Sequence, residues 1–187
     1  SPCTNKKTKD VEPGLLAERS QRAADVGASA FLSLQANAAA NPDLAGAALY
    51  VFDQEASSRN AAWLAEREDA NDGTPGQTTE MGTPTSVATA GSRVLADAML
   101  RELLQGVVLQ RAAVQHAPMV SLRQVAAPAL VIDVGSLSNR EDEQRLRGAE
   151  YLSHVADAIA RALGHYPDRP VPAGTSSPVA TVVALIP

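Results

Sequence analysis

Residues 129–139 read A-L-V-I-D-V-G-S-L-S-N. The first half of this stretch is a short apolar run rich in β-branched residues, preceded by Pro128 and closed by Gly135. Such a run is typical of a strand that is buried on both faces in a parallel sheet. We therefore expect it to form a buried strand around which the rest of the chain is organised.

Asp133 interrupts the apolar run near its carboxyl end. In open α/β sheets the binding crevice lies outside the carboxyl ends of the strands, so a carboxylate there is a candidate site residue. A structural interpretation stands beside this one, in which the carboxylate caps or tethers the following turn through one of three polar neighbours: Ser136, Ser138 or Asn139. The residues alone leave both interpretations open.

The composition is that of an ordinary globular domain. The chain has 187 residues, 45% of them hydrophobic and 20% charged, which suits a single domain with a sizeable core. Its 16 basic and 21 acidic residues give a net charge of −5, and only 3% of the residues are aromatic. This balance argues against nucleic acid as a partner, because neither a basic surface nor many stacking rings are available.

The cysteine count, the length of the apolar runs and the N-terminal residues further limit the possible classes of protein. A single cysteine, Cys3, allows no intramolecular disulfide. No run approaches the roughly 18 apolar residues of a membrane span. The first ten residues, S-P-C-T-N-K-K-T-K-D, are polar and basic without an apolar core after them, so we expect no signal peptide in this chain.

Residue spacing predicts strands alternating with helices. Strands are expected at 30–36 and 47–52, and helices at 14–26, 53–68, 91–105 and 150–163. Asp53 is the expected N-cap of the second helix, Trp63 is expected to anchor it in the core, and 69–86 is expected to be a long loop. This alternation predicts a three-layer α/β domain with a mostly parallel sheet flanked by helices.

Two of these helices have clear apolar faces. The helix at 91–105 presents six apolar side chains on one side: Val94, Leu95, Ala98, Met99, Leu103 and Leu104. The helix at 150–163 presents four: Leu152, Val155, Ile159 and Leu163. On its opposite side, His154 and Asp157 are spaced as a metal pair would be, but a solvated face is the favoured interpretation.

Three pieces of the sequence, in this order, carry a resemblance to a known family. They are T-K-D with L-L-A-E-R-S-Q-R-A (8–10 and 15–23), G-A-S-A-F-L-S-L-Q-A-N-A with G-A-A-L-Y-V-F (27–38 and 46–52), and P-A-L-V-I-D-V-G-S-L-S-N-R-E-D-E (128–143). Together they resemble the zinc-dependent N-acetylmuramoyl-L-alanine amidases of the third amidase type, which are bacterial cell-wall hydrolases. The resemblance runs from about residue 8 to residue 163.

The resemblance implies a set of functional positions. Family members hold one Zn²⁺ with a His from a G-H-G-G turn, a Glu from the next helix and the His of S-I-H-A-N, and a further Glu activates the zinc-bound water that attacks the muramoyl–L-alanine amide. Three protein ligands leave one zinc position open for that water, whose pKa the metal lowers. The resemblance places Asp133 at the catalytic Glu and Gln35 at the His of S-I-H-A-N. It also implies that Asn37, Ser138 and Asn139 contact substrate.

The chain departs from the family pattern at the metal. No G-H-G-G turn occurs in the sequence, so we expect the family's first strand and helix, with two zinc ligands, to be absent. Gln35 is a poorer zinc donor than imidazole, and Asp133 is one methylene shorter than Glu. A displacement of about 1 Å can cost about 10²-fold in rate. No substitute ligand set is evident, because no two of the three histidines, His116, His154 and His165, have the spacing of a helical metal pair.

The expected function is therefore that of a divergent peptidoglycan amidase-like protein of the cell envelope, periplasmic or extracellular, whose zinc binding and catalysis are impaired. The alternative is a non-catalytic amidase-fold module that binds peptidoglycan or a protein partner. Oligomeric state does not follow from the sequence.

The last 21 residues are expected to lie outside the main domain of residues 1–166. Residues 167–178 are rich in Pro, Gly and Ser and predict a linker. Residues 179–187, V-A-T-V-V-A-L-I-P, are apolar and strand-like, and we expect them to cover the sheet edge that the missing first strand would otherwise occupy.

Overall fold

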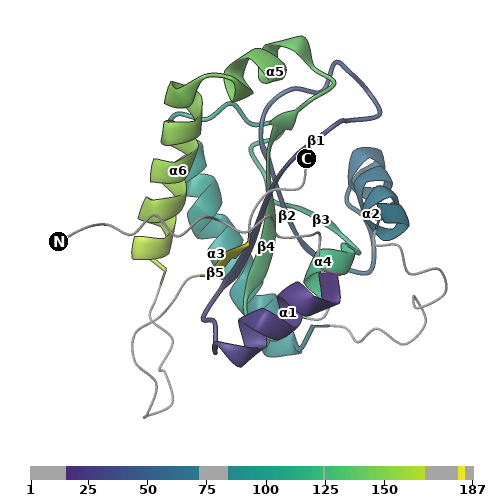
Figure 1. The fold of residues 1–187 in the computed structure, drawn as a ribbon, viewed down its shortest axis with the longest axis vertical. Coiled ribbons are helices and arrows are strands. Elements are labelled where there is room, and N and C mark those ends of the chain that lie inside the picture. Colours follow the sequence, from purple (N-terminus) through teal and green to yellow (C-terminus); the bar gives the residue numbers. More distant parts are fainter. Residues whose placement is uncertain (1–15, 72–83, 124, 167–180, 184–187) are drawn as a thin grey trace, which may run out of the picture.

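A computed structural model describes residues 16–71, 84–123, 125–166 and 181–183 (Figure 1). The helices are α1 (Leu16–Asp25), α2 (Arg59–Asn71), α3 (Ser86–Leu103), α4 (Val120–Arg123), α5 (Arg140–Leu146) and α6 (Ala149–Gly164). The strands are β1 (Phe31–Asn37), β2 (Ala48–Phe52), β3 (Gln115–Ala117), β4 (Ala129–Ser136) and β5 (Thr181–Val183).

The predicted organising strand is the centre of the sheet. The strand order is β3-β2-β4-β1-β5, and all eight residues of β4 are buried. β4 pairs with β1 in parallel and with β2 in antiparallel orientation, while β3 runs parallel to β2 and β5 parallel to β1. The prediction of a mostly parallel α/β sheet is confirmed.

Helices cover both faces of the sheet, each over its own hydrophobic core. The core on one face joins the sheet to α3 and α6, through side chains such as Met99 and Ile159. The core on the other face joins it to α1, α2 and α4, through side chains such as Leu64 and Leu122. Figure 1 shows α3 and α6 on the left of the sheet and α2 and α4 on its right. The three layers follow the sequence prediction.

The start of α2 differs from the prediction. The helix begins at Arg59, and Ser58 is the residue whose hydroxyl accepts a hydrogen bond from the Ala61 amide, at 3.1 Å. Asp53 instead accepts a bond from the Glu55 amide within the preceding turn, at 3.3 Å. Asp and Ser are both good N-caps, so residue type alone predicted the wrong cap residue for α2. Residues 69–71 belong to the helix rather than to the predicted loop.

α3 also begins earlier than predicted, at Ser86, with the Thr85 hydroxyl accepting a hydrogen bond from the Ala88 amide at 3.2 Å. Its apolar face was predicted partly wrongly, because Val94 and Leu104 are each 51% exposed. In α6, Leu152 is likewise 44% exposed. The sheet contacts only one stripe of each helix, and an apolar side chain beside that stripe stays in water.

Several other elements match their predictions. α1 lies within the helix predicted at 14–26 and is followed by Gly27, with φ +61°. Trp63 lies at the edge of the α2-side core, half-buried, with the Arg67 guanidinium 5.3 Å from its ring centroid. The predicted linker at 167–178 lies outside the described residues.

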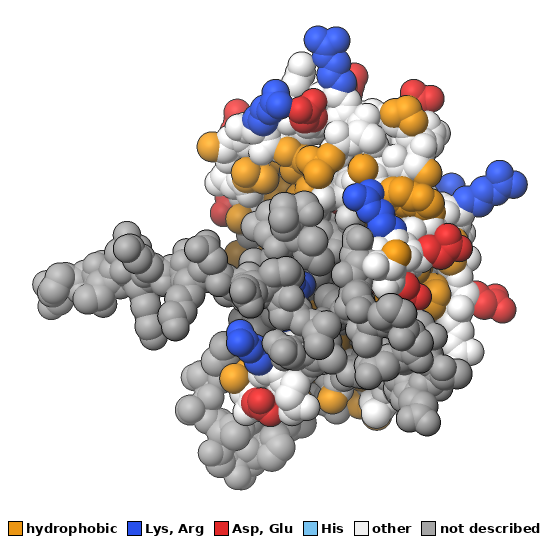
Figure 2. Space-filling view, turned by 45° about the vertical axis from the view of Figure 1, so that its right-hand side comes forward, with side chains coloured by type: hydrophobic (Ala, Val, Ile, Leu, Met, Phe, Trp, Pro, Cys, Tyr) orange, Lys and Arg blue, Asp and Glu red, His pale blue; other side chains and the backbone are white. Residues whose placement is uncertain are grey.

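The surface mixes charge and apolar groups. On the face of Figure 2, acidic and basic side chains are interspersed, and hydrophobic side chains gather between them in the upper half. None of the helices in the described part of the chain is long and apolar enough to cross a membrane.

Candidate functional site

The strand register brings the two main candidate residues together. Gln35 of β1 pairs with Asp133 of β4, and Ala48 of β2 pairs with Asp133 from the other side. In parallel strands, paired residues project from the same face of the sheet, here the face covered by α2. The carboxyl ends of β1 and β4 coincide, so both side chains lie at the edge where a crevice is expected.

Asp133 is almost fully buried, with 2% of its surface exposed. Its Oδ1 accepts hydrogen bonds from the backbone amides of Asn37 and Gly135, at 3.3 and 3.4 Å. Burial raises the pKa of this carboxyl to about 7, because the free-energy cost of removing the carboxylate from water exceeds the stabilisation that these two hydrogen bonds provide. The carboxylate does tether the following turn, but through the Gly135 amide rather than through Ser136, Ser138 or Asn139.

Gln35 is also buried, with 4% of its surface exposed. Its carboxamide makes no hydrogen bond to any residue that the structure describes. A neutral amide in this position brings no negative charge to compensate a divalent cation.

Tyr50 extends the polar group along the same face. It is completely buried, and it pairs with Val131 of β4 and with Gln115 of β3. Burial and, after it, the charge of Asp133 raise the pKa of the phenol. The hydroxyl accepts a hydrogen bond from the Asn60 amide nitrogen, at 3.4 Å. Tyr50 therefore joins the buried edge to the start of α2.

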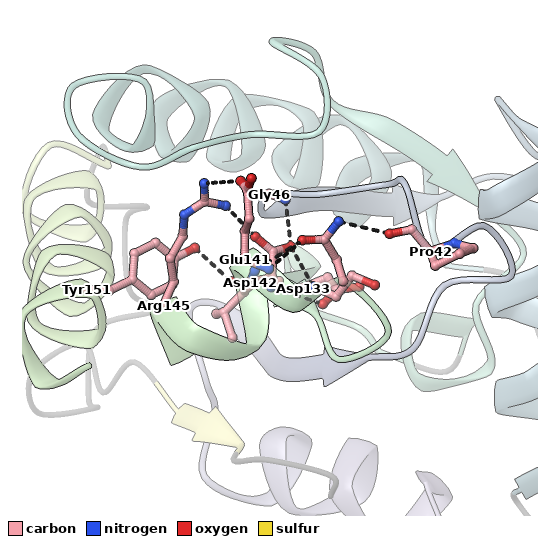
Figure 3. Close-up of polar contacts among 11 residues, drawn as sticks. Pro42, Gly46, Asp133, Glu141, Asp142, Arg145 and Tyr151 are labelled. Atoms are coloured by element: carbon pink, nitrogen blue, oxygen red, sulfur yellow. Dashed lines mark hydrogen bonds and ion pairs between the residues drawn. The ribbon is translucent and has the colours of Figure 1, made fainter. Parts of the chain in front are cut away.

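A second buried carboxylate, Asp142, lies next to this edge (Figure 3). Its Oδ2 accepts hydrogen bonds from the amides of Gly46 and Ser136, at 2.7 and 2.9 Å, and its Oδ1 forms an ion pair with Arg145 at 2.6 Å. Gly135 has φ +151°, and a Cβ there would lie 3.4 Å from the Asp142 carboxyl carbon. Asp142 thus joins three segments, and the positive φ at position 135 favours glycine beside it.

Sequence reasoning did not single out Asp142 as a candidate site residue. One signal was available: Asn139 is the N-cap of α5, and Asp142 is the third residue after it, a position that favours a carboxylate. The burial of that carboxylate depends on Gly46, 96 residues away, and has no local signature.

The residues predicted to contact substrate form hydrogen bonds within the protein, Ser138 and Asn139 through their side chains and Asn37 through its backbone. The Ser138 hydroxyl bonds to both the amide and the carbonyl of Ala39, at 2.9 and 3.1 Å. The Asn139 amide donates to the Pro42 carbonyl at 2.8 Å, while its oxygen caps α5. The Asn37 carbonyl accepts from the Leu137 amide at 2.8 Å. These contacts hold residues 38–46 against the end of β4.

The histidines lie apart from this edge. Nδ1 of His116 is 2.9 Å from the Glu55 carbonyl, His154 is exposed on α6, and His165 is 3.8 Å from Glu102. No group of three His, Cys, Asp or Glu side chains among the described residues is arranged to hold a metal ion. The described side chains at the β1–β4 edge, with Asp142 fully bonded and Gln35 neutral, do not fit a zinc centre.

Comparison with known sequences gives one consistent family. A family model described as N-acetylmuramoyl-L-alanine amidase matches residues 3–165. N-acetylmuramoyl-L-alanine amidase AmiA of Escherichia coli is 26% identical over 167 residues, which cover 81% of this chain and 56% of the relative. The probable N-acetylmuramoyl-L-alanine amidase AmiB of Haemophilus influenzae is 26% identical over 160 residues, which cover 78% of this chain and 37% of the relative.

Solved structures with the same fold are also amidases. The N-acetylmuramoyl-L-alanine amidase AmiC2 of Nostoc punctiforme superposes with a TM-score of 0.57 at 24% identity, over 82% of this chain and 66% of that one. Ami1 of Mycobacterium smegmatis superposes with a TM-score of 0.59 at 17% identity, over 81% of this chain and 59% of that one. At these identities the likeness establishes the fold, and the chain spans 56% of AmiA and 37% of AmiB, the curated relatives that it matches.

Proposed function

The chain belongs to the N-acetylmuramoyl-L-alanine amidase family, and from this premise we propose that it is a peptidoglycan-binding, amidase-like protein of the cell envelope whose zinc binding and hydrolysis are impaired. The observation that carries the proposal is the register pair Gln35–Asp133, which puts a neutral carboxamide beside the carboxylate at the site edge.

The chemistry of the pair supports this function. A zinc centre needs deprotonated or neutral-imidazole ligands, and a carboxamide is a weak substitute. Asp133 already accepts two backbone N–H groups, and Asp142 is held by two more and by Arg145. A carboxamide beside a carboxyl group still offers a donor and an acceptor, which is the pattern that recognises an amide. Muropeptide is therefore the ligand that we propose for this edge.

A second candidate function is a working zinc amidase whose metal ligands lie outside the described residues. The buried carboxyl of Asp133 favours it, because a pKa of about 7 suits a group that takes a proton from water near neutral pH. In this case Asp133 is the general base.

Zinc content and peptide release distinguish the two functions. We expect the purified chain to hold well under one zinc per molecule, to release no peptide from purified peptidoglycan, and to sediment with that peptidoglycan. We expect Gln35→His to raise zinc affinity, because imidazole is the better donor. One tight zinc per molecule together with peptide release that Asp133→Asn abolishes would instead establish the second function.

Failure to sediment with peptidoglycan would overturn peptidoglycan binding and leave a protein partner as the remaining non-catalytic role. Folding is checked for each variant by far-UV circular dichroism. Peptide release that persists in Asp133→Asn indicates a contaminating hydrolase and does not count for either function.

A further inference from the structure

A cavity of about 640 Å³ lies beside the candidate site, between residues 40–44, the start of α2 and residues 110–115. Cavities of this size are typical of sites for small molecules. One wall is continuous with the site edge, because the segment that lines the cavity bonds through Ala39 and Pro42 to Ser138 and Asn139, just after β4. The proposed peptidoglycan function does not use this cavity.

The cavity carries positive charge on an acidic protein. Arg59 and Arg111 line it, and none of the described residues that line it is Asp or Glu, although the chain has a net charge of −5. Within the described part of the chain, neither guanidinium forms an ion pair or a hydrogen bond. Other arginines, such as Arg145 and Arg161, are paired with carboxylates.

The floor of the cavity is polar and uncharged. Gln115 is buried there, and its Oε1 accepts a hydrogen bond from the Ser58 hydroxyl at 3.0 Å. Asn60 lines the same wall and donates to the Tyr50 hydroxyl. These partners fix the amides in place, so the floor is rigid before any ligand arrives.

We propose that this cavity binds the carboxylate of a small organic ligand, which Arg59 and Arg111 contact while the amides of the floor contact its uncharged part. Guanidinium groups pair with carboxylates through two parallel hydrogen bonds, which gives both affinity and orientation. The carboxylate can come from an acidic peptide or from a sugar acid.

Trp63 provides a fluorescence probe on the helix whose start lines the cavity. It is the only tryptophan in the chain and lies four residues after Arg59 on α2, one helical turn away. Titration of the protein with the dipeptide Ala-Glu, with its doubly amidated form, with glucuronic acid and with inorganic phosphate, followed by Trp63 fluorescence, tests the proposal.

We expect saturable binding of at least one carboxylate and none of the amidated dipeptide. Preference for Ala-Glu over glucuronic acid identifies a peptide as the source, and the reverse identifies a sugar acid. We expect Arg59→Gln and Arg111→Gln each to weaken binding about tenfold, the loss of one charged hydrogen-bond partner.

The matched controls are Arg101→Gln and Arg140→Gln, which remove the same charge from exposed positions outside the cavity. We expect them to leave the affinity unchanged. Equal weakening by the control variants, equal binding of the amidated dipeptide, tighter binding of phosphate, or no saturable binding of either carboxylate would overturn the proposal. Because no readout involves zinc or peptidoglycan, its failure is distinct from failure of the proposed function.

Discussion

Two buried carboxylates lie at the end of β4, and their surroundings differ. Asp142 has a cation, Arg145, and two short hydrogen bonds from backbone amides. Asp133 has no ion pair among the described residues, and its two backbone contacts are long, at 3.3 and 3.4 Å. This difference explains why burial dominates at Asp133 and raises its pKa.

The raised pKa makes folding stability depend on pH. Between the ordinary pKa of 3.8 and the folded value of about 7, the folded state binds more protons than the unfolded state. The free energy of unfolding therefore falls as pH rises through this window, by an amount on the order of a few kcal/mol. Above pH 7 the full penalty for burying the charge is present.

We expect Asp133→Asn to reduce this pH dependence, because an amide is neutral at every pH while its oxygen can still accept the Asn37 and Gly135 amides. Urea unfolding at pH 5 and pH 8 measures the effect, with the exposed Glu150→Gln as control. Part of the pH dependence of the free energy of unfolding should remain, because burial also raises the pKa of Glu68. An unchanged difference between the two pH values would contradict the prediction.

At the scale of elements, α3 is attached closely to the start of β4. The Ser92 hydroxyl accepts a hydrogen bond from the Ala129 amide and donates one to the Ala88 carbonyl, both at 2.8 Å. One residue earlier, Gly91 allows the helix backbone to approach Pro128: a Cβ at Gly91 would lie 2.6 Å from the proline Cγ. The position of the central strand against α3 depends on these small residues.

We expect Gly91→Ala to destabilise the protein by about 1–2 kcal/mol, since overpacking against Pro128 outweighs the better helix propensity of alanine. Thermal unfolding measures the change, at roughly 2–4 °C per kcal/mol for a domain of this size. The matched control is Gly164→Ala at the end of α6, where a Cβ would meet nothing within 4 Å. If the Gly91 variant were as stable as the Gly164 variant, the close approach to Pro128 would not be what requires glycine at position 91.

At the scale of the whole molecule, a short strand near the C-terminus pairs with β1 in the sheet. β5 lies beside β1 at the sheet edge, with Thr181 opposite Phe31 and Val183 opposite Ser33 (Figure 1). The strand adds backbone hydrogen bonds to an edge that would otherwise present free N–H and C=O groups. The domain boundary near residue 166 stays a prediction.

We expect removal of residues 179–187 to lower the melting temperature and to increase aggregation, because it uncovers the β1 edge. Thermal unfolding and light scattering measure the two effects. Removal of residues 184–187 alone is the control, since it leaves Thr181–Val183 in place. Unchanged stability and solubility after the longer deletion would contradict the role assigned to this strand.

The element types and the layered α/β class follow from the sequence alone. Strand alternation and helical periodicity are local properties, so β1, β2, β4 and α6 lie close to their predicted bounds. The family resemblance rests on short sequence motifs and likewise does not depend on the tertiary structure. The helix starts were less predictable, because Asp53 and Ser58 are both acceptable caps and only packing chooses between them.

Tertiary structure alone decided which side chains share a site. The register places Gln35 beside Asp133, the bond to Gly46 holds the buried Asp142, and three distant segments put Arg59 and Arg111 on the walls of one cavity. Each of these contacts joins residues far apart in the chain, and each depends on how the layers pack. Burial, and with it the raised pKa of Asp133, follows from that packing and has no local pattern in the sequence.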